Sequence, residues 1–347
     1  TVGGGSVGKW LVTSRAQQGQ KDQVMVTSYS PTFSLERFNP GEDISSDDPK
    51  KYPVFTASIN EIGCNRSEGA VTIELCTHSG GQTKKAIKSM VEEGVLKSGD
   101  TIIVAQNGID SAQKVLELLP DELKESICVA RYIVSVGMNA FDGGVAETFD
   151  VKHEIAPLSK SYENCNSLVQ YADQLRAQNR DVFLLSVEDG EKAAIMKRAK
   201  NTWNLVGAMF VSLQNNKSIM KELSVDDQSK LIKLLNSKSK FDKDHPLTYK
   251  DTKSLGWGRA KFSQLVKEFY ECYKKELDTD YESFFQLVDP YGDTDHVSST
   301  VSSIVNEKEV EFDIFDETIK RGDELGVDMK QTKAAIESLQ ELRKGVF

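Results

Sequence analysis

The sequence is poor in the features that mark secreted, membrane-spanning and metal-dependent proteins. Five of its 347 residues are cysteines, an odd number with no CxxC spacing, and its four histidines show no metal-ligand spacing. We therefore expect neither a disulfide framework nor a structural zinc site, and we assign no metal ligand. We recognise no apolar run of membrane-spanning length, no signal peptide, no internal repeat and no low-complexity tract. These absences favour a cytoplasmic protein with free, buried thiols.

Charge and length narrow the choice further. The formal net charge of −10 argues against nucleic acid or an anionic membrane as the main partner. A content of 39% hydrophobic and 28% charged residues is typical of soluble globular proteins. Because 347 residues is long for one domain, we expect two.

A glycine-rich segment lies at residues 3–8, where Gly3, Gly5 and Gly8 have the spacing GxGxxG. In a βαβ unit the first glycine makes a tight turn, the second lets the backbone approach a pyrophosphate, and the third lets helix and strand pack closely. Phosphates bind the free N–H groups at such a helix N-terminus, so Ser6 and Val7 join the candidate cofactor contacts. We expect the given sequence to start inside or just before the first strand. A flexible glycine-rich terminus is the alternative.

The first part of the chain alternates between patterns typical of strands and of helices. Strand, helix and strand with short connections indicate a doubly wound parallel sheet. Residues 40–52, rich in Pro, Asp, Ser and Lys, are interpreted as a solvated loop. The expected elements are a helix over 8–18, a strand over 23–27, a strand over 70–76, a helix over 82–96 and a strand over 101–105.

Beyond about residue 127 the pattern becomes β-rich, with a turn at Gly143-Gly144, and after residue 190 it becomes helical. We therefore expect an α/β nucleotide-binding domain over 1–185 and a helical substrate domain over 186–347, with a substrate cleft between them. The charged stretch 236–253 is interpreted as a surface loop, and the acidic stretch 289–295 as a helix-capping loop rather than a calcium site. Long helices are expected over 191–213, 259–276 and 297–323.

The residues after the second strand bear on the choice of cofactor. NAD sites usually place a carboxylate there, whereas NADP sites avoid that charge and offer polar or basic groups to the 2′-phosphate. This sequence has Thr27-Ser28-Tyr29-Ser30 and then Arg37. NADP(H) is therefore the expected cofactor, with Ser28 and Arg37 as candidate contacts.

The order of motifs resembles the ketopantoate reductases, the NADPH-dependent 2-dehydropantoate 2-reductases, over almost the whole chain. Gln106-Asn107-Gly108 follows a strand and matches the family's QNG, which implies that Asn107 lies near nicotinamide and substrate. The resemblance implies an α/β fold in which a Rossmann-type dinucleotide-binding domain precedes an all-helical domain similar to the C-terminal domain of 6-phosphogluconate dehydrogenase.

A second match, over residues 200–208, is to the family's KxxxNxxxN helix. The resemblance implies that Lys200 is the general acid, giving a proton to the carbonyl oxygen, and that Asn204 holds the substrate. Residues four apart share a helix face, so both side chains and position 208 are expected to face the cleft. An alternative register makes Lys197 the acid with Asn201 beside it, and a solvated surface lysine is the structural alternative.

The third match is the most specific. Residues 298–313 follow the family's SSMxQDxxxxRxTEID without a gap. The resemblance implies that Ser299 binds the substrate carboxylate and that Glu311 hydrogen-bonds a substrate hydroxyl.

The chain departs from the family pattern at several positions. Ala208 stands in place of the second Asn, Ser303 in place of Asp and Glu307 in place of Gly, and no Lys occurs in residues 77–82. The Trp203-Asn204 pair and the greater length resemble the yeast and fungal branch, which includes paralogues of unassigned substrate.

Three functions remain from the sequence. The leading one is NADPH-dependent reduction of a 2-oxo acid or related ketone, above all 2-dehydropantoate to pantoate in pantothenate biosynthesis. The second is a divergent NADP-binding paralogue that acts as a sensor or on a different ketone. An opine-type or other hydroxy-acid dehydrogenase is the third, against which residues 298–313 argue. We expect a small-molecule ligand, no nucleic-acid or membrane partner, and a homodimer as one candidate assembly.

Overall fold

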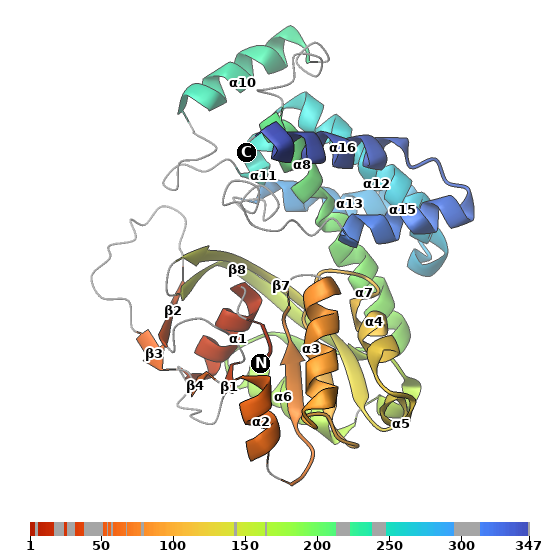
Figure 1. Cartoon of the computed structure of the whole chain (residues 1–347). Coiled ribbons are helices and arrows are strands. Elements are labelled where there is room, and N and C mark those ends of the chain that lie inside the picture. The colour runs from red at the N-terminus through yellow and green to blue at the C-terminus, as the bar shows by residue number, and fades with distance from the viewer. Residues whose placement is uncertain are drawn as a thin grey trace. The chain divides into compact units, whose positions relative to one another are not determined.

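The computed structural model divides the chain into two compact units, Thr1–Ala194 and Ile195–Phe347 (Figure 1). The dividing line falls within α7 (Val187–Lys200), whereas the predicted boundary at residue 185 falls just before this helix. The structure describes residues 1–3, 6–16, 24–25, 32–37, 51–53, 55–56, 58–66, 68–77, 80–141, 144–163, 165–212, 223–237, 248–294 and 313–345, with some of their side chains excepted.

A seven-stranded mixed sheet forms the centre of the first unit, with β3, β2, β8, β7, β6 and β5 in that order and β9 paired with β8. The β5–β6 and β6–β7 pairs are parallel, so this part of the sheet confirms the predicted parallel arrangement. β7 and β8 instead form a long antiparallel hairpin. The bounds are β2 (Thr32–Arg37), β3 (Lys51–Pro53), β5 (Thr72–Leu75), β6 (Thr101–Val104), β7 (Cys128–Phe141), β8 (Gly144–Pro157) and β9 (Val182–Leu184).

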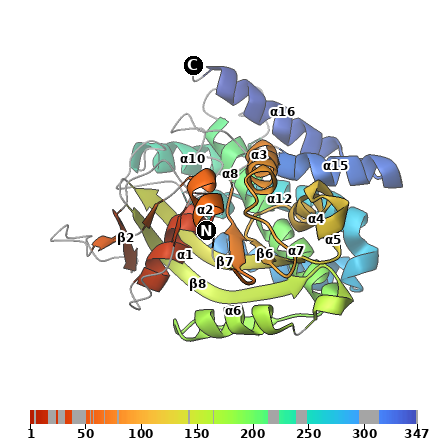
Figure 2. The same cartoon turned by 60° about the horizontal axis from the view of Figure 1, so that its bottom comes forward.

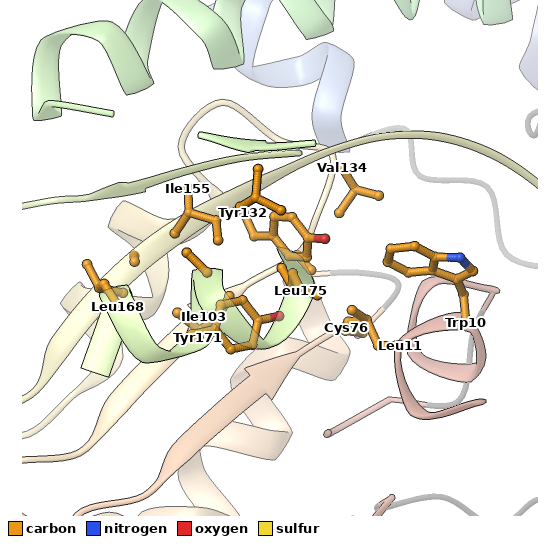
Figure 3. Packing of buried hydrophobic residues seen from close by; sticks show 14 of the residues in the cluster. Trp10, Leu11, Cys76, Ile103, Tyr132, Val134, Ile155, Leu168, Tyr171 and Leu175 are labelled. Carbon is orange, nitrogen blue, oxygen red and sulfur yellow. The ribbon is translucent and has the colours of Figure 1, made fainter. Parts of the chain in front are cut away.

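The strands β5 and β6 are almost wholly buried because helices cover both faces of this part of the sheet. One core cluster joins α1 and α6 to one face, and another joins α3 and α4 to the opposite face (Figure 2). Figure 3 shows the first cluster, in which Tyr171 and Leu175 of α6 pack toward Tyr132 of β7. The helices are α1 (Ser6–Ala16), α2 (Ile59–Asn65), α3 (Gly80–Glu92), α4 (Ser111–Leu118), α5 (Asp121–Lys124), η1 (Lys160–Tyr162) and α6 (Asn166–Arg176).

Two small strands lie apart from the main sheet. β1 (Val24–Met25) pairs in parallel with β4 (Phe55–Thr56). β3 pairs with β2, so the prediction of a loop over 40–52 is wrong at residues 51 and 52. Strand pairing decides the structure there although the local composition is polar.

The described part of the second unit is entirely helical, as the sequence predicts. α8 packs on α12 and α16, and at this contact the ring of Trp203 stacks on Phe262 with centroids 4.1 Å apart. A Cβ on Gly292 would lie 2.4 Å from Trp203, so only glycine fits there. The elements are α8 (Thr202–Ser212), α10 (Val225–Ser237), α11 (Tyr249–Lys253), α12 (Gly256–Leu277), α13 (Tyr281–Val288), η2 (Asp289–Asp293), α15 (Asp313–Leu325) and α16 (Lys330–Gly345).

Two sequence predictions in this unit need correction. Residues 249–253, predicted to lie in a surface loop, form α11, which begins with a capping box between Thr248 and Asp251. The predicted helix over 191–213 is interrupted at Asn201, because Asn and Thr at 201–202 are weak helix formers. Among the described residues, no helix has both the length and the apolar character needed to cross a membrane.

Candidate functional site

The glycine-rich segment begins beside β5. Val2 forms a parallel bridge with Leu75, its N–H donates to Glu74 O at 2.6 Å, and Cys76 N–H donates to Val2 O at 2.7 Å. α1 starts at Ser6, three residues beyond Gly3. This order of extended segment, turn and helix is the context that gives a GxGxxG spacing its meaning.

Gly3 and Gly8 are required by the geometry of this turn. Gly3 has a φ of +109°, and a Cβ there would lie 2.5 Å from Cys76 O. A Cβ on Gly8 would lie 1.9 Å from Gly3 O, so the backbone of α1 packs directly against the backbone of Gly3. The tight turn and the close helix contact are the roles that the dinucleotide-binding motif gives its first and third glycines.

The N-terminal turn of α1 suits an anion because it carries no acidic residue. Ser6 and Val7 occupy its first positions, where backbone N–H groups lack intrahelical partners. Gly5 lies outside the described residues. The described part of the turn therefore fits the pyrophosphate of a dinucleotide.

The two residues predicted to bind a 2′-phosphate are described only in part. Ser28 lies outside the described residues. Arg37 is the last residue of β2, in register with Glu147 of β8. Its assignment stays a prediction.

Asn107 follows β6 and is exposed, and its neighbour Gln106 anchors the same loop. Gln106 Nε2 lies 2.9 Å from Thr77 O, 2.6 Å from Thr77 Oγ1 and 2.7 Å from Thr83 Oγ1. This network ties the carboxyl ends of β5 and β6 to the first turn of α3. Gln106 belongs to the QNG motif, but nothing in the sequence indicates its contacts with Thr77 and Thr83.

Lys200 is the last residue of α7 and is half-buried, as is Lys197 one turn earlier. Asn204 lies in α8 beyond the turn at Asn201, and Tyr249 Oη donates to Asn204 Oδ1 at 2.5 Å. Asn204 is 9% exposed and Ala208 is fully buried, so this face of α8 packs within the second unit.

Tyr249 is the residue that sequence reasoning missed most clearly. It was placed in a surface loop, yet it is 1% exposed, and burial raises the pKa of its phenol well above the usual value, with a smaller contribution from Tyr291. The Thr-x-x-Asp signature of a capping box at residues 248–251 was the available signal for the helix that buries it.

A buried arginine connects α7 with the helix that follows the 298–313 motif. The guanidinium carbon of Arg198 lies 3.9 Å from the ring centroid of Phe315, in the first turn of α15. α15 starts two residues after Glu311 in the sequence, and Phe315 is its third residue. Ser299 and Glu311 themselves, together with Ser303, lie outside the described residues.

The acidic stretch after α13 has basic partners. Lys253 Nζ lies 2.9 Å from Asp289 Oδ2 and 2.7 Å from Asp293 Oδ2. The ammonium of Lys253 thus offsets part of the negative charge of these two carboxylates. Within the part of the chain that the structure describes, no group of His, Cys, Asp and Glu side chains could hold a metal ion.

Comparison with known proteins identifies the fold. No protein-family model matches the chain. Solved structures align over nearly the whole chain. One is a PanE/ApbA-family ketopantoate reductase from Ralstonia eutropha JMP134, which is 16% identical with a TM-score of 0.67. The alignment covers 99% of this chain and 98% of that one. D-mandelate dehydrogenase with NADH and anilino(oxo)acetate is 13% identical with a TM-score of 0.67, over 99% and 98% of the two chains.

A dimeric ketopantoate reductase from Staphylococcus aureus is 15% identical with a TM-score of 0.64, again over 99% of this chain and 98% of that one. An uncharacterised protein of Arabidopsis thaliana is 26% identical over 147 residues, which are 41% of this chain and 43% of the plant protein, less than half of either. The structural likenesses show that the chain has the expected α/β fold, a Rossmann-type unit followed by a helical unit.

Proposed function

We propose that the protein is an NADPH-dependent reductase of a 2-oxo acid or a related ketone, and that 2-dehydropantoate is the first substrate to test. The observation that carries the proposal is the turn at residues 3–8, where Gly3 and Gly8 leave no room for a Cβ and α1 presents an N-terminus without acidic residues. The fold shared with ketopantoate reductase and D-mandelate dehydrogenase supports the same chemistry.

The proposed cofactor site comprises the backbone of Gly3, Gly5 and Gly8 with the N–H groups of Ser6 and Val7. Bound NADPH supplies the hydride that reduces the carbonyl carbon. NADPH rather than NADH is proposed because Thr27-Ser28-Tyr29-Ser30, where an NAD site places a carboxylate, contains none, and Ser28 and Arg37 are candidate contacts for the 2′-phosphate.

Lys200 is proposed as the general acid that donates its Nζ proton to the carbonyl oxygen. Lys200 is half-buried at the end of α7, and its ammonium is a proton donor. A positioned acid of this kind contributes about 10²–10⁴-fold to the rate. Lys197 with Asn201 is the alternative register.

The remaining residues would orient the substrate. Asn107 would hold the carbonyl through its amide. Asn204 would use its Nδ2 amino group, because its Oδ1 already accepts from Tyr249. Ser299 and Glu311 would bind the carboxylate and hydroxyl groups of the substrate. Support comes from the contact between Arg198 and Phe315, which joins the lysine-bearing helix to the helix that directly follows Glu311.

A divergent paralogue is the second candidate function. Fully buried Ala208 cannot replace the amide of the family's second Asn, and Ser303 replaces an acidic residue. Such a protein would bind NADP(H) and act as a sensor or on another ketone. For either function a homodimer is proposed by analogy with the Staphylococcus aureus reductase, which is described as dimeric.

The test combines cofactor binding and turnover. NADPH oxidation is followed with 2-dehydropantoate and a panel of 2-oxo acids and diketones, while binding is measured by calorimetry. Lys200→Ala is expected to lose at least about 10²-fold in kcat and still bind NADPH. If Lys197→Ala loses turnover instead, the alternative register is correct.

The glycine turn is tested separately. Gly8→Ala is expected to abolish NADPH binding, because its Cβ would meet Gly3 O at 1.9 Å. Gly256→Ala is the matched control, since its Cβ would lie 3.4 Å from the nearest atom, Asp227 Oδ2. Unchanged NADPH affinity in a folded Gly8→Ala variant would refute the proposed cofactor site. Tight binding without turnover of any substrate would favour the divergent paralogue.

A further inference from the structure

Two cysteines that are 37 positions apart in sequence meet in the first unit. Cys165 Sγ lies 3.9 Å from Cys128 Sγ. Cys128 is the first residue of β7 and is buried, whereas Cys165 is the N-cap of α6 and is half-buried. Neither their spacing nor their surroundings in the sequence indicates this pairing.

Hydrogen bonds near the two sulfurs tie the surrounding elements together. Ser167 Oγ lies 3.3 Å from Cys165 Sγ and 2.7 Å from Oγ1 of Thr101, the residue in register with Cys128. Tyr162 Oη donates to Glu125 O at 2.6 Å, which ties the segment before α6 to the segment before β7. The contact between the sulfurs therefore belongs to a hydrogen-bonded junction of β6, β7 and α6.

We propose that Cys128 and Cys165 are an oxidisable dithiol, a modification site at which hydrogen peroxide converts the two thiols into an intramolecular disulfide. The proposal goes beyond the proposed reductase activity and does not depend on it.

The two sulfurs have different environments and therefore different roles. Cys165 is the more accessible member and occupies the N-cap position of the 11-residue helix α6, where its side chain makes no capping hydrogen bond. Burial raises the pKa of the Cys128 thiol, with a smaller contribution from Cys165. Cys165 is therefore the thiol that meets the peroxide, and Cys128 is the thiol that resolves the product.

The reaction balances in two steps. The Cys165 thiolate attacks one peroxide oxygen, the O–O bond breaks, and sulfur is oxidised to a sulfenic acid while the other oxygen leaves as water after taking a proton. The Cys128 sulfur then attacks the sulfenic sulfur. An S–S bond forms, the S–O bond breaks, and the hydroxide leaves as water with the Cys128 proton.

Closing the bond requires the sulfurs to approach from 3.9 Å to about 2 Å. Cys128 is fixed within the paired strand β7, so most of this movement falls on Cys165 at the half-exposed helix end.

The experiment uses the full-length protein, reduced and then exposed to hydrogen peroxide while circular dichroism shows that it remains folded. Free thiols are blocked with N-ethylmaleimide, and a non-reducing digest is analysed by mass spectrometry. The expected product is a peptide pair joined through Cys128 and Cys165, with a protein mass lower by two hydrogen atoms, and dithiothreitol reverses both changes.

Variants assign the roles of the two sulfurs. Cys128→Ala is expected to accumulate a sulfenic acid on Cys165 that dimedone captures, whereas Cys165→Ser gives neither the adduct at 165 nor a linked peptide. Cys272→Ala, the control, removes a buried thiol of the second unit and keeps the link.

The proposal is overturned if the folded, peroxide-treated protein keeps both thiols open to alkylation after denaturation. It is equally overturned if the linked peptide appears only when urea is present during oxidation, because the contact in the native fold would then play no part.

Discussion

Arg66 and Asp100 form a buried, two-pronged ion pair whose loss we expect to destabilise the first unit strongly. Arg66 Nη1 and Nη2 donate to Asp100 Oδ2 and Oδ1 at 2.7 and 2.6 Å, and the side chains are 3% and 0% exposed. Asp100 also accepts hydrogen bonds from the backbone N–H groups of Val71 and Lys97, at 3.0 and 2.8 Å. This carboxylate therefore fixes the segment that leads into β6 and on to Asn107.

The proposed change is Arg66→Met, which keeps the apolar stem and removes the charge. Asp100 would remain buried and keep its hydrogen bonds to backbone N–H groups, but it would lose its cationic partner. Removing one member of a buried ion pair lowers the unfolding free energy by about 3–5 kcal/mol. For a unit of this size each kcal/mol lowers Tm by about 2–4 °C. We therefore expect a fall of roughly 6–20 °C.

Hydrogen exchange of the β5 and β6 amides reports the first unit specifically, because these strands pair with each other. Lys160→Met is the matched control. It breaks the ion pair between Lys160 and Glu188, whose side chains are 74% and 75% exposed, and solvent screening leaves such exposed pairs with little effect on stability. If Arg66→Met costs no more than Lys160→Met, the pair at Asp100 is not structural and the reasoning fails.

Three further outcomes are expected. Gly292→Ala should lower the unfolding free energy of the second unit by about 1–3 kcal/mol, because the new Cβ would lie 2.4 Å from Trp203. An unchanged midpoint of urea unfolding would contradict this. Burial raises the pKa of Tyr291 from 10.0 to about 12, so its contribution to stability is complete below pH 10 and is lost as pH rises toward 12. Tyr291→Phe should therefore show a shallower loss of unfolding free energy over that window in alkaline urea titrations, and equal slopes would refute the assignment. Arg131→Met should raise the unfolding free energy by about 1 kcal/mol, because Arg131 Nε and Nη1 are buried without a hydrogen-bond partner among the described residues. A clear fall in unfolding free energy in urea would contradict this. It would mean that the attraction of Glu191 and Asp110 for the guanidinium outweighs its desolvation.

The sequence predicted those parts of the fold that depend on local sterics and periodicity. The GxGxxG spacing alone predicts glycine turn positions at 3 and 8. The structure gives the reason, because Gly3 has a positive φ and Gly8 has no room for a Cβ. The parallel strands β5 and β6 were found because they are short, apolar and bounded by turns.

The prediction was weaker where tertiary contacts decide. A Lys- and Asp-rich composition favoured a loop at 249–253, yet a capping box and the burial of Tyr249 make a helix. Nor could sequence show that the Asn204 amide is bonded to Tyr249, 45 positions away. The roles of Lys200, Asn107, Ser299 and Glu311 stay predictions, because they come from a resemblance and not from a described contact.

The outer strands of the main sheet bear on how the protein avoids association with itself. On the side of β8 away from β7, β2 pairs with the first residues of β8 and β9 pairs with residues near its end, so neither strand runs along the full length of β8. β9 has three residues, and so has β3, which carries Lys51 and Pro53. Both strands are too short to offer many free N–H and C=O groups in a row to a strand from another molecule, and β3 also carries a charge and a proline. The architecture that supports the glycine turn thus also resists edge-to-edge aggregation at these two strands.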